Sequence, residues 1–162
     1  MTHPTPESRR VDTARQLLTL TELIDVEYLE VSARKRDGSD NTPELIDEVD
    51  VSVQVGLGAQ LIEVRCLAQA ESTVATFCVD VVGKFAMYEP VEIADDALSS
   101  FIGSIALPSI YPFLRESIFQ AAAKLRVDPP LLSLLRTADV KVNVPISGNS
   151  ADMGRGHRGS PR

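Results

Sequence analysis

The segment Leu107–Leu135 constrains the fold of this chain more than any other part of the sequence. Its apolar residues recur at the 3.6-residue spacing of an α-helix, so one face of that helix has to be buried. Asp128, Pro129 and Pro130 then end the helix, because proline has no amide hydrogen to donate. Four leucines follow within five positions, too few residues to build a core of their own. We therefore expect a long amphipathic helix, followed by a leucine-rich stretch that packs against the rest of the domain or stays partly exposed and binds a partner.

Four stretches before this helix have the pattern of β-strands: 23–34, 49–55, 61–70 and 74–88. Leu29 falls out of the alternation and predicts a bulge, while Gly83 predicts a bend or bulge in the fourth strand. The short connections favour antiparallel neighbours, since parallel crossovers are longer. Short helices are expected at 13–23 and 95–103. The sequence predicts an α+β fold, a four-stranded antiparallel meander sheet followed by a long amphipathic helix packed on one face.

The 162 residues suffice for one domain with a core of its own. Residues 1–15 are polar and contain two prolines and three arginines, which predicts a flexible arm. Residues 16–144 are expected to form the folded domain. Residues 145–162 are rich in glycine and arginine without apolar periodicity, which predicts a disordered tail.

Several classes of function are disfavoured by composition. The net charge of −7 argues against nucleic acid and anionic membrane surfaces as partners. No membrane insertion is expected, and without a signal peptide a cytoplasmic location is the natural expectation. Both histidines lie in the tails, so the folded part lacks a histidine base, and no phosphate-binding glycine loop occurs. Cys66 and Cys78 are expected to be small buried apolar residues. The sequence thus favours a binding protein over an enzyme and predicts no cofactor and no metal.

The sequence has more large apolar residues than a four-stranded sheet covered on one face requires. They occur at 77–87, 101, 111–119 and 131–135. Such a surplus predicts either a groove for extended, unfolded polypeptide or an interface between subunits. The residues alone leave both interpretations open.

Two motifs in this region resemble the SecB family of export chaperones. Tyr111–Glu116 places a proline between two aromatic residues and follows it with an Arg-Glu pair, as at the start of the family's main helix. Pro129–Leu132 matches the family's crossover of two prolines followed by leucines. The four strand-like stretches also precede these motifs in the family's order. The resemblance covers roughly residues 20–135, most of one domain.

The resemblance implies an ATP-independent holdase that assembles as a homotetramer, a dimer of dimers, and binds unfolded or precursor polypeptides. By matching position, the client-binding residues would be Phe85, Met87, Pro129, Pro130, Leu131, Leu132, Leu134 and Leu135. The residues expected at the oligomer interface are Phe101, Tyr111, Phe113, Leu114 and Ile118.

Some positions depart from the family. In members dedicated to export an acidic sheet surface docks the SecA motor, but Cys78 stands where the family has a glutamate. Glu27, Glu30 and Asp80 are the nearest acidic residues and form the possible motor-docking surface. A strand-like stretch at 140–144 replaces the family's terminal helix. Two alternatives therefore stay open: a SecB-like chaperone dedicated to an antitoxin in a toxin–antitoxin module, or a non-chaperone oligomeric α+β domain that binds a ligand.

Overall fold

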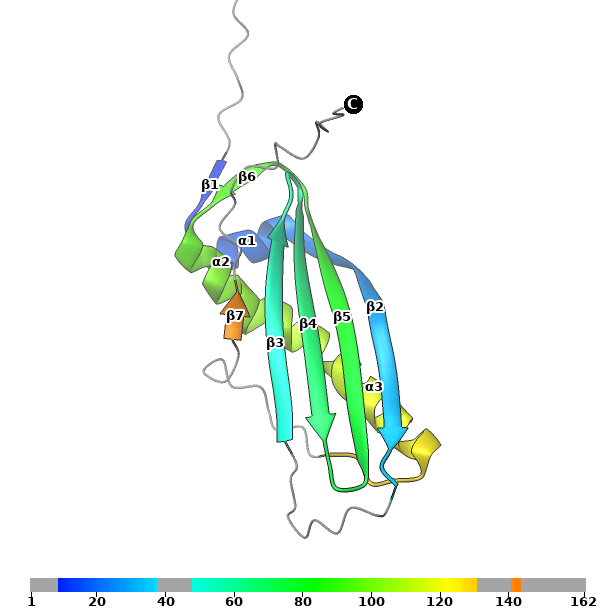
Figure 1. Cartoon of the computed structure of the whole chain (residues 1–162). Coiled ribbons are helices and arrows are strands. Elements are labelled where there is room, and N and C mark those ends of the chain that lie inside the picture. The colour runs from blue at the N-terminus through cyan, green and yellow to red at the C-terminus, as the bar shows by residue number, and fades with distance from the viewer. Residues whose placement is uncertain (1–8, 38–47, 131–140, 144–162) are drawn as a thin grey trace, which may run out of the picture.

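A four-stranded antiparallel sheet forms one layer of the protein, and a helical rod crosses one of its faces (Figure 1). The computed structural model describes residues 9–37, 48–130 and 141–143. The strands are β2 (Thr21–Lys35), β3 (Glu48–Leu57), β4 (Leu61–Glu71) and β5 (Ala75–Met87). A short fifth strand, β7 (Lys141–Asn143), pairs in parallel with the outer edge of β3. The predicted α+β class and all four predicted strands are confirmed.

The strand order differs from a simple meander in one respect. The sheet runs β2-β5-β4-β3-β7, so β3, β4 and β5 form the meander and β2 lies beside β5 instead of β3. β2 pairs with β5 along its whole length, from Thr21 opposite Met87 to Lys35 opposite Ala75. The connection between β2 and β3 is therefore no hairpin, and β2 becomes an edge of the sheet.

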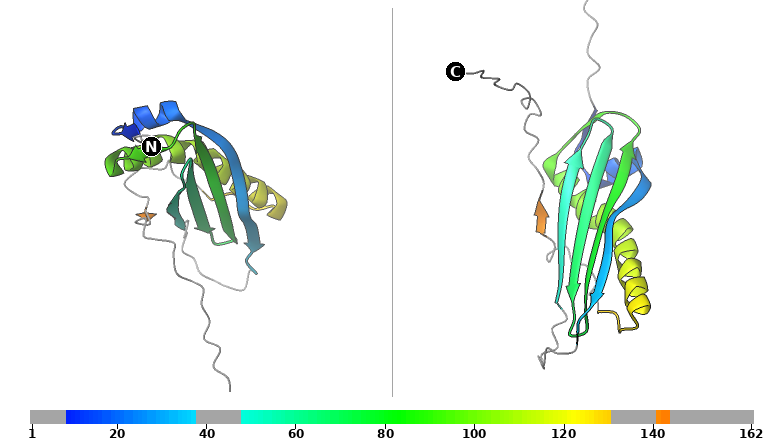
Figure 2. Two further views of the ribbon diagram at one scale, coloured as in Figure 1. Left: turned by 90° about the horizontal axis from the view of Figure 1, so that it is seen from above. Right: turned by 45° about the vertical axis from the view of Figure 1, so that its right-hand side comes forward.

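The helical rod consists of α2 (Asp95–Phe101), a π-helical turn (Ile102–Ala106) and α3 (Leu107–Leu125). It runs diagonally across one face of the sheet, and none of the helices in the described part of the chain lies over the other face (Figure 2). The rod is long and apolar enough to cross a membrane by length and composition alone. Burial explains its apolar composition, because the face of the rod that packs on the sheet belongs to the core.

The long helix ends at Leu125, shortly before the proline pair, as the sequence predicts. Arg126 adopts the left-handed conformation at φ 55° and donates its N–H to the carbonyl of Ala123 at 3.1 Å. The N–H of Val127 donates to the carbonyl of Ala122 at 3.1 Å, which completes a Schellman end. The chain then leaves the helix through the half-buried Pro129 and the buried Pro130.

Regular structure begins inside the predicted flexible arm, closer to the N-terminus than expected. Arg9–Val11 form strand β1, which pairs in parallel with β6 (Val91–Ile93). α1 (Ala14–Leu20) starts at a capping box in which Thr13 and Gln16 satisfy each other's backbone amides. Val11 is only 1% exposed, and burying this side chain in the core explains why the segment 9–15 is not a loose arm. Residues 1–8 and 144–162 lie outside the described residues, so the predictions for them stay untested.

The two bulges in β2 keep its apolar residues facing the helical rod. The register with β5 shifts between Leu23 and Asp25 and again between Tyr28 and Glu30. The second shift confirms the bulge predicted at Leu29. Each shift adds one residue, and so Leu23, Val26, Tyr28 and Val31 all stay in phase on one face although their sequence spacing changes from two to three.

Gly83 allows the helical rod to approach the sheet closely. It stays in register with Val26 and Val64, so the strand has no bulge there. A Cβ atom at this position would lie 2.5 Å from Cδ1 and 2.7 Å from Cγ1 of Ile110, a fully buried residue of α3. Next to this contact the rings of Phe85 and Phe101 meet edge to face at 5.4 Å. The sheet and the rod therefore touch where the sequence has its smallest residue.

We expect Gly83→Ala to lower the free energy of unfolding by about 2 kcal/mol, because the added methyl overpacks the core against Ile110. Urea denaturation measures this. Gly56→Ala is the matched control in β3, on the far side of β4, where the new Cβ would lie 3.5 Å from the Glu63 side chain. It should change stability by less than about 0.5 kcal/mol. Ile110→Val removes the clashing Cδ1 and should partly rescue Gly83→Ala. Strictly additive losses in the double variant would contradict this account.

Candidate functional site

The outer edge of β2 is the longest exposed edge of the sheet. The strand is 15 residues long and pairs with β5 alone among the described residues. Four large apolar side chains on it are exposed: Ile24 57%, Tyr28 43%, Leu29 49% and Val31 50%. An edge with unpaired backbone groups and apolar side chains is a template for a further strand. This edge can accept another extended segment, either from a different protein or from a second copy.

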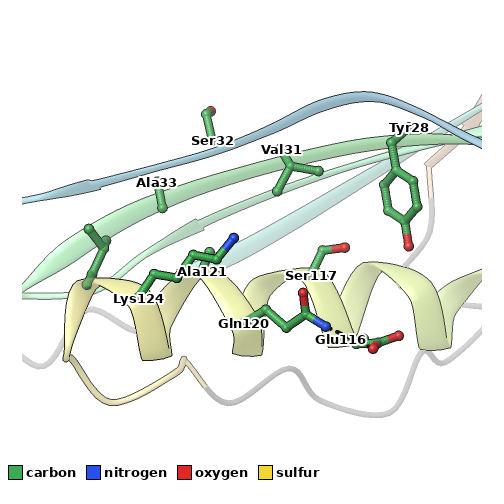
Figure 3. Close-up of a pocket in the computed structure, with 10 residues that line it drawn as sticks. Tyr28, Val31, Ser32, Ala33, Glu116, Ser117, Gln120, Ala121 and Lys124 are labelled. Atoms are coloured by element: carbon green, nitrogen blue, oxygen red, sulfur yellow. Dashed lines mark hydrogen bonds between the residues drawn. The ribbon is translucent and has the colours of Figure 1, made fainter.

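A groove separates the second half of β2 from the C-terminal half of α3; we call it the β2–α3 groove (Figure 3). Its volume is about 460 Å³. Tyr28, Val31 and Ala33 point from the strand toward the helix, whereas Ser32 points to the opposite side (Figure 3). Across from them lie the α3 residues that complete the lining: Glu116, Ser117, Gln120, Ala121, Lys124 and Leu125. Gln120 donates from Nε2 to Glu116 Oε1 at 3.0 Å, which holds the polar rim on the helix side.

The opposite edge of the sheet, on β3, is partly covered. β7 pairs with Ser52–Gln54, three residues of a ten-residue strand. Val53 and Val55 are buried, while Val49 and Val51 on the same face are half-buried. The described residues thus provide two edges, an uncovered one on β2 and a partly covered one on β3.

Of the predicted client-binding residues, the structure places Phe85 and Met87 in the core. They are 3% and 6% exposed, and both belong to the cluster between sheet and rod. Neither side chain is accessible to a client, because the even-numbered residues of β5 face outward and the odd-numbered ones face the rod. Pro129 is half-buried and Pro130 is buried. Leu131, Leu132, Leu134 and Leu135 lie outside the described residues.

Of the five residues predicted at the oligomer interface, three are buried in the core and two are half-buried. Phe101, Leu114 and Ile118 have no exposed surface and pack in the core. They cannot form an interface between subunits, because the sheet already covers the face of the rod on which they lie. Tyr111 and Phe113 are half-buried. Tyr111 packs against the core cluster, and burial raises the pKa of its phenol. The exposed face of α3 instead carries Phe119, under the guanidinium of Arg115 at 5.5 Å.

The three acidic residues of the possible motor-docking surface lie on the outer face of the sheet, and each has a partner within this chain. Asp80 is 4% exposed and accepts three hydrogen bonds from Arg65. Nε donates to Oδ1 at 3.0 Å and to Oδ2 at 3.2 Å, and Nη2 donates to Oδ2 at 2.6 Å. Glu27 accepts from Lys84, which raises the pKa of that lysine. Glu30 accepts from Ser32. Asp80 is therefore internally neutralised, while Glu27 and Glu30 stay exposed.

Both cysteines are free thiols in the sheet. Cys66 is fully buried on the face toward the rod, and burial raises its pKa to about 12. Cys78 is half-buried on the outer face with a raised pKa, mainly through burial and the charge of Glu30. Within the described ranges, no group of three or more metal-ligating side chains comes together. The thiolate, and not the thiol, acts as a nucleophile or binds a metal ion. A buried thiol that stays protonated is therefore unsuited to either role.

Sequence reasoning predicted a surface for extended polypeptide but did not identify which strands lie at the edges of the sheet. β2 pairs with β5, a strand far from it in the sequence, and local sequence patterns do not predict such long-range pairing. One signal was present: the charged residues of β2 change from acidic to basic along the strand. They are Glu22, Asp25, Glu27 and Glu30, followed by Arg34 and Lys35.

Two of the three comparisons with known proteins found SecB-like chaperones. No family model matches the chain. The SecB-like chaperone SmegB of Mycolicibacterium smegmatis is 29% identical over 128 residues, 79% of this chain and 84% of SmegB. A solved structure of the Mycobacterium tuberculosis SecB-like chaperone Rv1957, in complex with a ChAD peptide from the HigA1 antitoxin, matches with a TM-score of 0.61. That match covers 76% of this chain and 93% of the other at 17% identity. The resemblance to the SecB-like chaperones seen in the sequence is confirmed.

The raised pKa of Cys66 predicts a loss of stability at high pH. The folded protein holds this thiol proton up to about pH 12, whereas the unfolded chain releases it near 9.0. The contribution to stability is therefore complete below pH 9 and declines above it. Between pH 8 and 10.5 wild type should lose about 2 kcal/mol more than Cys66→Ala in chemical denaturation. Equal pH profiles for the two proteins would contradict a buried, protonated Cys66.

Proposed function

We infer that this chain, which is similar in sequence and fold to the SecB-like chaperones, is an ATP-independent holdase for unfolded polypeptide. The observation that carries this inference is the match to SmegB over 79% of the chain. The fold agrees with it, because a single helical layer leaves the edges of the sheet open to extended segments. The matched relatives are named as chaperones, and we propose no catalysed reaction and no cofactor for this chain.

A holdase of this kind would hold an unfolded client through many weak contacts. Each apolar segment of a client that leaves water contributes about 25 cal/mol per Å² of buried apolar surface. Several such segments on one assembly bind strongly together, because each bound segment raises the effective concentration of the next. Single contacts still exchange fast enough to release the client. The half-buried Pro129 and the leucines that follow Pro130 are proposed as part of this surface.

The range of clients is the finer part of the proposal. Preproteins for Sec-dependent export are one candidate, with SecA as partner in the cytoplasm. The second candidate is a single dedicated antitoxin, and the Rv1957 complex with an antitoxin peptide favours it. The internal pairing of Asp80 with Arg65 also weakens the case for a motor-docking surface.

We also propose that two copies associate through β2, as the first step toward a dimer of dimers. Acidic residues occupy the first part of the strand and basic residues its end. An antiparallel pairing about a two-fold axis near Leu29 sets the acidic part of each copy beside the basic end of the other. The exposed Tyr28 and Val31 of both copies then meet at the β2–α3 groove. The strand is therefore complementary to itself in both charge and apolar surface.

Holdase activity can be tested by light scattering of a chemically unfolded, slowly refolding client diluted into buffer without ATP. We expect suppression of aggregation near one tetramer per client, because a slowly folding chain exposes apolar segments for longer. Addition of ATP should change nothing. An equal mass of a non-chaperone protein is the control. Failure to suppress aggregation in tenfold excess would exclude a general holdase and leave a single dedicated partner.

A charge at the middle of β2 should separate the subunits. Val31→Asp places like charges close together at the two-fold axis, beside the acidic Glu30 of each copy. We expect the mass from size exclusion with light scattering to fall to half or less. Val74→Asp alters a side chain of similar exposure, 42%, in the turn before β5 and should leave the mass unchanged. A normal mass for a folded Val31→Asp protein would rule out assembly through β2.

A further inference from the structure

The outer face of the sheet, the one turned away from the helical rod, carries an excess of acidic side chains. The carboxylates that the strand registers place on this face are Glu22, Asp25, Glu27, Glu30, Asp50, Glu63, Glu71 and Asp80. The cations that the registers place there are Arg34, Arg65 and Lys84. Arg65 is paired with Asp80, and Lys84 is paired with Asp25 and Glu27. The face therefore stays negative after its internal ion pairs have formed.

Several of these carboxylates are left for a partner. Among the described residues, no cation pairs with Glu22, Glu30, Asp50 or Glu63. They lie on β2, β3 and β4, so the negative charge extends across the whole width of the sheet. No helix of the described part of the chain lies over this face (Figure 2). Such a surface attracts a segment that carries positive charge.

A hollow of about 580 Å³ lies on this face near the end of β2. Ser32, Cys78 and Gln69 line it side by side from three neighbouring strands. The polar side chains that complete the lining are Arg34, Glu71 and Thr76. Glu30 lies next to the hollow and accepts a hydrogen bond from Ser32. A guanidinium group has five donors and no acceptor, so these hydroxyl, amide and carboxylate oxygens suit an arginine side chain.

The C-terminal part of this chain has the complementary charge. Residues 144–162 contain Arg155, Arg158 and Arg162 but only one acidic residue, Asp152. The described chain reaches Asn143, which lies opposite Gln54 at the β3 edge of the sheet. The segment from there to Arg155 spans up to about 40 Å when it is extended. The distance from β3 to β2 is three strand spacings, about 15 Å, so the arginines can reach every part of the face.

We propose that the outer face of the sheet binds the basic tail of this chain, residues 154–162, with an arginine in the hollow beside Cys78. Exposed ion pairs contribute little each and are screened by salt, so the contact is weak. The tether offsets this weakness by holding the tail at an effective concentration of about 1 mM. The tail then occupies the face for part of the time, and any other basic segment has to displace it. This inference does not depend on the holdase function.

A full-length variant without the tail charges tests the contact within the chain. It carries Arg155→Gln, Arg158→Gln and Arg162→Gln. We expect the amide signals of Ser32, Gln69 and Cys78 in ¹H–¹⁵N spectra to differ between wild type and this variant at about 20 mM salt. The two spectra should coincide at about 0.5 M salt, where the Debye length is only about 4 Å. Identical signals from these three amides at low salt would overturn the proposal.

A peptide with the sequence of residues 150–162 tests the same contact between molecules. Titrated into the tail variant, it should shift the same three amides with a dissociation constant of about 1 mM. Wild type should bind the peptide about twofold more weakly, because its own tail occupies the face about half of the time. The peptide with glutamine in place of its arginines should not bind. A peptide that leaves these amides unchanged would show that the face does not accept the tail.

Paired charge variants locate the site. In the tail variant, Glu30→Gln/Asp50→Asn removes two carboxylates of the outer face that have no cationic partner among the described residues. Glu92→Gln/Glu116→Gln removes the same charge from β6 and α3 and is the matched control. Unchanged thermal unfolding establishes that both proteins are folded. The first variant should bind the peptide at least threefold more weakly, and the control should bind it normally. Equal losses in both would mean unspecific attraction, and the proposal would be wrong.

Discussion

The contact between Gly83 and Ile110 is the constraint on which the rest of this structure depends. It brings the helical rod onto the sheet at a distance that no larger residue at position 83 would allow. Around it the rod buries Phe85, Phe101 and Leu114, so one layer of helix closes the core of the sheet. The rod lies on a face of the sheet and not along β2, so the outer edge of β2 stays exposed in the described part of the chain.

The two edges differ in what they can bind. β2 is long, exposed and divided into an acidic and a basic part, which makes it complementary to a second copy in antiparallel pairing. β3 already holds a short parallel strand from its own chain beside a row of valines. Assembly through β2 would leave β3, with β7 beside it, toward the outer ends of a continuous sheet. The strand order thus places two different edges on opposite sides of the sheet.

Patterns along the chain predicted the elements well and the site poorly. The out-of-phase Leu29 indicated a real bulge, and the prolines at 129 and 130 marked the end of the helix. Phe85, Met87, Phe101, Leu114 and Ile118 were expected at binding surfaces because the sequence seemed to have more apolar residues than one packed face requires. The rod and the sheet use all five in their common core. Counting apolar residues cannot tell a core face from an exposed face, since both need the same side chains.

The sequence by itself determined the strands, the long helix, its end and the resemblance to the SecB family, because periodicity, proline and short motifs act over a few residues. Only the tertiary structure decided that β2 lies beside β5, that Val11 belongs to the core and that Gly83 serves close packing. It also decided that Asp80 is neutralised by Arg65, 15 residues away in the chain. These features depend on which distant segments meet. That choice follows from the total burial of the whole chain, which no local stretch of sequence contains.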